Sequence, residues 1–192
     1  MGRKSQFTDE QVFTWLASRL VASPHVSIQE LSEGTGVSVG SIYHRYGSLD
    51  GLLGSAFISA GEAFYPTATQ ELQGTGRPIL LNVAMQAYRL ATINPVAATL
   101  LFAVPRGALV GPGLPAELRA HISARDSAFV QTCQKFWQRS DISFSAGEQA
   151  MLTVPQAIVA RYLPDGPIPD TARQFILRCA NGILGLGLRY EP

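Results

Sequence analysis

Residues 27 to 53 read SIQELSEGTGVSVGSIYHRYGSLDGLL and predict two short helices joined by a tight turn. Ser27 and Glu30 have the spacing of a capping box, which satisfies two backbone N–H groups at a helix N-terminus. Gly34 and Gly36 then end the first helix, because glycine readily adopts the left-handed conformation found after a helix C-terminus. The next helix is expected to begin directly after this turn.

Ser38 is placed to cap the second helix. Val39, Ile42 and Tyr46 recur at helical spacing and predict its apolar face. The other face is left with polar side chains, namely Ser41, Tyr43, His44 and Arg45. Two helices joined in this way form a helix-turn-helix, whose second helix enters the major groove of DNA.

The segment resembles the tetracycline-repressor (TetR) family of bacterial transcription regulators. The resemblance rests on Gly36-Val37-Ser38, Gly40-Ser41, Tyr43-His44-Arg45-Tyr46 and Ser48-Leu49-Asp50. It extends upstream, where Thr8 and Gln11 have the spacing of a second capping box. An apolar helical face follows, made of Phe13, Leu16, Ala17, Leu20 and Val21. Beyond this first quarter of the chain, the likeness is only one of length, helical character and layout.

The resemblance implies an all-α fold with two parts. Residues 1–53 are expected to form a three-helix DNA-binding module, and residues 54–192 a helical domain for ligand binding and dimerisation. The resemblance also implies that the protein is a repressor, which binds a palindromic operator as a homodimer. A small apolar or amphipathic effector then releases the DNA by shifting the helix that connects the two parts.

Composition agrees with this interpretation. The chain has 192 residues, of which 46% are hydrophobic and 15% charged, so apolar side chains suffice for a core and an interface. No apolar run is long enough to span a membrane, and the N-terminal stretch lacks the apolar segment of a secretory signal, so we expect a cytoplasmic protein. Cys133 and Cys179 lack metal-site spacing and are expected to be small buried hydrophobes. We expect no metal and no cofactor.

The rest of the sequence predicts further helices and no strands. A connecting helix is expected to end before Pro66, and Pro155 is expected to kink a later one. Residues 104–115, rich in proline and glycine, predict a loop. The other helices are expected at about 78–93, 98–102, 118–137, 146–162 and 170–190.

The charge of the N-terminal module argues for weak nonspecific DNA binding. Residues 1 to 55 contain four basic and five acidic side chains, a formal charge of minus one. Phosphate binding draws its free energy from cationic side chains, so the salt dependence is expected to be shallow. The candidate DNA contacts are Arg3, Lys4, Ser38, Val39, Gly40, Ser41, Tyr43, His44, Arg45, Tyr46 and Ser48. Tyr46 is equally well explained as a packing residue, and His44 nearly as well as a solvated one.

The candidate effector contacts are mostly aromatic or apolar residues of the second part. They are Phe64, Met85, Tyr88, Phe102, Arg106, Phe129, Cys133, Trp137 and Gln156. Most aromatic side chains at helical spacing are ordinary core, and Arg106 is explained slightly better as an exposed loop residue. The resemblance also implies a four-helix interface between two subunits, formed by the last two helices. Its expected residues are Ile158, Gly182, Ile183 and Leu186.

The sequence leaves two other classes of function to consider, an enzyme and a binding protein. An enzyme requires convergent titratable groups, yet His25, His44 and His121 are scattered along the chain and no phosphate-binding glycine loop follows a strand. The second alternative is a helical ligand- or protein-binding dimer with little remaining DNA affinity. The negative N-terminal module motivates that alternative.

Overall fold

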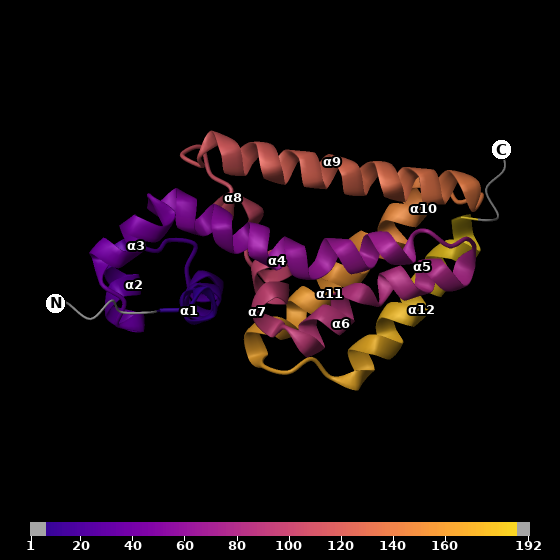
Figure 1. Ribbon diagram of the computed structural model, residues 1–192. Coiled ribbons are helices and arrows are strands. Elements are labelled where there is room, and N and C mark those ends of the chain that lie inside the picture. The colour runs from indigo at the N-terminus through magenta and orange to yellow at the C-terminus, as the bar shows by residue number, and fades with distance from the viewer. Residues whose placement is uncertain (1–6, 188–192) are drawn as a thin grey trace.

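The computed structural model describes residues 7–187, which form helices joined by short turns and contain no strands (Figure 1). The expected all-α fold is therefore confirmed. The three N-terminal helices form a group at one end of the molecule, and the remaining helices form a larger bundle beside it. Arg3 and Lys4 lie outside the described residues, as do the last residues of the expected C-terminal helix.

The N-terminal group consists of α1 (Asp9–Ala22), α2 (Ile28–Thr35) and α3 (Val39–Tyr46). Each helix contributes side chains to a common small core. Leu16, Leu31 and Ile42 are fully buried there, one from each helix. Helix α3 therefore packs on its two neighbours through one apolar face, and its other face is left outward.

Local capping sets the limits of these helices. The capping box of Ser27 and Glu30 is present, and Ser38 caps α3 through the backbone N–H of Ser41. Gly36 closes the turn with a φ of 72°, in the left-handed region that favours glycine. The expected second capping box is only half formed, because Gln11 donates its side-chain amide to the carbonyl of Thr35.

Helix α4 (Leu49–Glu71) joins the N-terminal group to the bundle. It begins at Ser48, which caps it, and it runs without interruption across the expected boundary at residues 53 and 54. The expected end before Pro66 is wrong. Pro66 is exposed, while Phe64 and Ala68 on either side of it are buried. Packing of the flanking turns therefore stabilises the helix despite the missing N–H group.

The segment expected as one helix over residues 78–93 is two, α5 (Arg77–Ala84) and α6 (Gln86–Ile93). The break falls at Met85. Asn94 then caps α7 (Pro95–Ala98), which continues into a π-helical turn, η1 (Thr99–Ala103). The expected loop at residues 104–115 contains a short helix, α8 (Arg106–Leu109).

Helix α9 (Ala116–Arg139) lies along α4 on one side of the bundle (Figure 1). The chain then forms α10 (Phe144–Glu148), the π-helical turn η2 (Gln149–Thr153) and α11 (Val154–Tyr162). Pro155 lacks the N–H that would bond the carbonyl four residues earlier, so the expected irregularity is accommodated in η2. A 3-10 turn, η3 (Leu163–Asp165), leads to α12 (Asp170–Gly187), which packs on α11.

Candidate nucleic-acid interface and ligand clefts

Within residues 7–187, helix α3 presents a polar face that is largely exposed. Tyr43 is 50% exposed, and Gly40, His44 and Arg45 are also exposed. Val39 and Ser41 are half-buried at the first turn of the helix. Because Ile42 anchors the opposite face, this exposed face is held in a fixed orientation relative to the module.

The candidate serine contacts act first as helix caps. Ser38 accepts from the backbone N–H of Ser41 at 3.2 Å, and the hydroxyls of these two residues are 2.8 Å apart. Ser48 accepts from the backbone N–H of Gly51 at 2.9 Å. The Ser48 hydroxyl can still donate one hydrogen bond to a phosphate oxygen, and so can whichever of the Ser38 and Ser41 hydroxyls accepts in this pair. Their position at the helix N-termini also places backbone N–H groups nearby, which favour anions.

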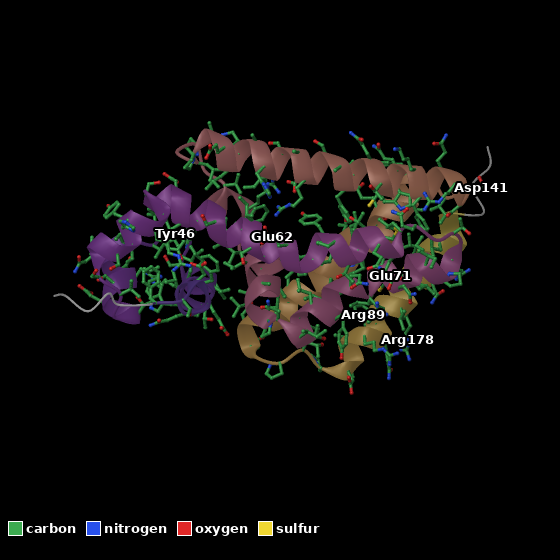
Figure 2. The ribbon with its side chains drawn as sticks, in the orientation of Figure 1. Tyr46, Glu62, Glu71, Arg89, Asp141 and Arg178 are labelled. Carbon is green, nitrogen blue, oxygen red and sulfur yellow. The ribbon has the colours of Figure 1, made fainter. Side chains whose placement is uncertain are left out.

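Arg45 and Tyr46 are both bound to Asp9 at the start of α1. Arg45 forms a salt bridge to the Asp9 carboxylate, with Nε 2.8 Å from Oδ1, and its guanidinium lies over the ring of Phe7. The Tyr46 hydroxyl donates to the same carboxylate. Burial and this hydrogen bond both raise the pKa of Tyr46 above its usual value. Figure 2 shows Tyr46 within the N-terminal module, where its ring also lies 6.3 Å from that of Phe13.

Both basic residues of the module within the described range are therefore paired with acids. Arg19 donates to Glu30 at 2.9 Å, and this hydrogen bond is the main reason that the pKa of Glu30 is lowered. Sequence reasoning missed Asp9 as a partner of Arg45, because the two residues are 36 positions apart. Because both arginines are already paired, fewer cationic side chains are available to bind phosphate than the number of basic residues in the module suggests.

We expect Asp9→Asn to increase nonspecific DNA binding and its salt dependence. The substitution removes a negative charge and releases Arg45 to reach a phosphate, so the slope of log K against log salt steepens by about 0.9. Fluorescence anisotropy with a random duplex over a salt series measures this slope. The matched control is Glu33→Gln on exposed α2, which removes the same charge but releases no arginine. Equal slopes for the two variants would contradict the role assigned to Arg45.

Several candidate effector residues meet in one aromatic cluster between α4, η1 and α9. The Phe64 ring packs edge-on against Phe102, with centroids 5.4 Å apart, and against Phe129 at 6.2 Å. Tyr65, which is not among the candidate effector contacts, completes the cluster at 5.0 Å from Phe129. Burial raises the pKa of Tyr65, so its hydroxyl stays protonated.

Cys133 and Trp137 lie in the closed core beneath α9. Cys133 is fully buried, and burial raises the pKa of its thiol to about 12. The Trp137 indole N–H donates to the sulfur of Met151 at 3.0 Å. Cys179, also expected to be buried, is only partly so. Their surroundings are those of packing residues, and a role for Cys133 or Trp137 in effector binding stays a prediction.

Arg106 takes part in a network that the sequence did not predict. It pairs with Asp126 at 2.7 Å and lies over the ring of Phe57. Arg125 pairs with the same carboxylate at 3.3 Å and stacks 4.4 Å from the centroid of Tyr65. Arg106 is thus held against α9, although its side chain remains 54% exposed.

The other candidate effector residues do not join the aromatic cluster directly. The Tyr88 hydroxyl donates to Asp170 at 2.9 Å, and this bond is the main cause of its raised pKa. Met85 is buried at the break between α5 and α6, and Gln156 is half-buried on α11. The candidate set therefore spans both sides of the bundle.

Three open clefts flank α4. One of about 470 Å³ separates α1 from α4 and α7, one of about 310 Å³ lies between α4 and α9, and one of about 380 Å³ lies between α4 and α6. Phe129 lines the second and Phe64 the third. These volumes fall at the lower end of the range of small-molecule sites, about 300–1,000 Å³. Among residues 7–187, no three acidic, histidine or cysteine side chains gather as metal ligands do.

The candidate interface residues lie on α11 and α12. Ile158 and Ile183 are half-buried, and Gly182 is exposed with open space around it. The side chain of Leu186 lies outside the described residues. Phe175, which is not among the expected interface residues, is 54% exposed on the same side of α12, two helical turns before Gly182.

The sequence matches no protein-family model and no curated protein. The fold is similar to that of a solved structure described as a TetR family transcription regulator from Marinobacter aquaeolei VT8. The two chains share 13% sequence identity and superpose with a TM-score of 0.63, over 92% of this chain and 94% of the other. Across residues 7–187, every helix is too short or too polar to cross a membrane. The chain therefore has the fold of a TetR family transcription regulator.

Proposed function

We propose that this protein is a DNA-binding transcription regulator that responds to a small molecule. The observation that carries the proposal is the combination of an exposed, polar α3 with a fold of the TetR type. The capped turn at Gly36 sets the angle between α2 and α3, and Ile42 anchors α3 in the module. Tyr43, at the centre of the exposed face, is the residue we assign to phosphate or sugar contact.

The regulator acts as a homodimer in this proposal. Two recognition helices separated by about 34 to 36 Å meet successive major grooves and read a palindromic operator. Exposed Phe175 and Gly182 on α12 support an interface there, because a partner helix would cover the Phe175 ring and could approach closely at the glycine. Ile158, Ile183 and Leu186 complete that interface.

The effector releases the operator by favouring a different spacing of the two α3 helices. Helix α4 supplies the mechanical connection, because it starts directly after α3 and continues as far as Glu71 in the bundle. Only a ligand with different affinities for the two spacings shifts the equilibrium. Repression is the direction we assign, with release on ligand binding.

Selection of bound fragments from random duplex DNA tests the proposal. We expect a palindromic consensus, and Tyr43→Ala is expected to weaken its binding by about tenfold, the value of one lost hydrogen bond to a charged group. Val130→Ala on exposed α9 is the control and is expected to leave the affinity unchanged. Selection that yields no consensus would contradict sequence-specific binding.

A second function is favoured by the charge of the module. Because Arg19 and Arg45 are both paired with acids, a ligand- or protein-binding dimer with little DNA affinity is the alternative. A salt titration with random DNA separates the two. Binding that weakens as salt rises favours the regulator, and the absence of any salt-dependent binding favours the alternative.

A further inference from the structure

The cleft between α4 and α6 has an apolar wall and a polar end. Two helical faces line it, both with the spacing expected for neighbours on a helix. Helix α4 contributes Ala63, Phe64, Thr67 and Glu71, and α6 with the residue after it contributes Gln86, Arg89, Leu90, Ile93 and Asn94. Ile93 is 82% exposed at the rim, so a large apolar side chain there faces water.

Gln86 is the unusual residue of this cleft. The residue is only 5% exposed, and its amide nitrogen Nε2 has no hydrogen-bond partner within residues 7–187. A buried amide group without a partner is costly, and such groups are rare in native proteins. Gln86 lies at the first position of α6, where an apolar residue would pack at no such cost. A ligand atom that accepts a hydrogen bond would explain why glutamine is present.

Arg89 supplies further donors on the same face of α6, three residues after Gln86. Its Nη1 atom lies 3.5 Å from Glu71 Oε1, a long contact between two partly exposed side chains. In Figure 2, Glu71 on α4 and Arg89 on α6 lie close together. A guanidinium carries five N–H donors in a planar arrangement, so this single contact leaves most of them free for another partner.

We propose that the α4–α6 cleft binds a small molecule with an apolar body and a carboxylate. The carboxylate accepts hydrogen bonds from Gln86 and Arg89, because both offer donors and a carboxylate has two acceptor oxygens. The apolar body lies between Phe64, Leu90 and Ile93 and covers the exposed part of Ile93. Glu71 still accepts a hydrogen bond when Arg89 turns to the ligand, because Nδ2 of Asn82 lies 3.4 Å from its Oε2 atom.

The chemistry of this cleft is independent of DNA binding. That the bound acid also acts as the effector rests on the proposed function. The link between them is α4, which forms one wall of the cleft and begins next to α3. A ligand inserted between α4 and α6 changes the distance between these helices.

Isothermal titration calorimetry of the full chain without DNA tests the binding. The probes are octanoate and trans-cinnamate, each compared with the alcohol of the same carbon skeleton. We expect each acid to bind at least about tenfold more tightly than its alcohol, as for one charge-assisted hydrogen bond. Alcohols that bind as tightly as the acids would overturn the proposal, as would no binding of either acid at millimolar concentration.

Two substitutions test the assigned donors. Gln86→Leu and Arg89→Met are each expected to weaken acid binding by about tenfold and to leave alcohol binding unchanged. Gln86→Leu also removes the unpartnered amide, so its thermal midpoint is expected to match or exceed that of the parent. Unchanged acid affinity in both variants would overturn the assignment of the donors.

A matched pair of variants tests the place of binding. Ala63→Phe fills the α4–α6 cleft, and Ala128→Phe fills the α4–α9 cleft by the same side-chain volume on an equally exposed position. We expect only Ala63→Phe to abolish acid binding, and the reverse result would overturn the proposal. Acids that bind in the α4–α6 cleft but leave operator affinity unchanged would support this inference and contradict their role as effectors.

Discussion

Gly182→Arg is expected to convert the proposed dimer into monomers. Each subunit would place an arginine at the α12 surface, and an uncompensated charge in the interface costs about 3 kcal/mol, or about a hundredfold in the dissociation constant. Operator affinity is expected to fall with it, because a lone protomer holds only one half-site. Sedimentation equilibrium measures the dimer constant, and anisotropy with the selected operator measures DNA binding.

Within a single subunit, Gly182→Arg is expected to stabilise helix α12, although it weakens association. Among the described residues, nothing lies within contact of a Cβ placed at Gly182, and replacing an interior helical glycine stabilises a helix by about 0.8–1 kcal/mol. A monomer that is at least as stable as the parent therefore shows that Gly182→Arg disrupts association and not folding. Gly182→Ala is the control, since it gives the helix effect without a charge. A Gly182→Arg protein that remains dimeric would place the interface elsewhere.

Phe136→Ala is expected to cause the largest loss of stability from one core position. Phe136 is fully buried on α9, on the side that packs on the bundle. Truncating such a ring removes its apolar burial and leaves a cavity, which together lower the free energy of unfolding by about 3–5 kcal/mol. Urea denaturation followed by circular dichroism measures the loss.

Phe144 provides the matched control for this measurement. Its ring is 52% exposed and makes an edge-on contact with Trp137, with centroids 5.1 Å apart. Loss of one aromatic pair is worth about 0.5–1.5 kcal/mol, so Phe144→Ala is expected to be much milder. Similar losses for the two variants would show that the core is not centred beneath α9.

The starts of α2, α3 and α4 were predictable because they depend on neighbours in the sequence. Ser27, Ser38 and Ser48 each cap the helix that follows, through atoms only a few residues away. The all-α fold and the exposed face of α3 follow from similarly local patterns of apolar and polar residues. The expected helix end before Pro66 was wrong because it depends on tertiary packing. Burial of the turns on either side of Pro66 outweighs the lost hydrogen bond.

The arrangement of the candidate sites was decided by tertiary structure. Arg45 is a basic residue on α3 by sequence, but Asp9 on α1 holds it, and this pairing lowers the charge available to DNA. Gln86 reads as one polar residue in a helix, yet packing buries its amide beside the α4–α6 cleft. The sequence by itself determined the all-α fold and the exposed face of α3, because both depend on short-range hydrogen bonds and side-chain periodicity. Contacts between distant residues determined which polar groups are paired and which are left for a ligand, because they depend on how the helices pack.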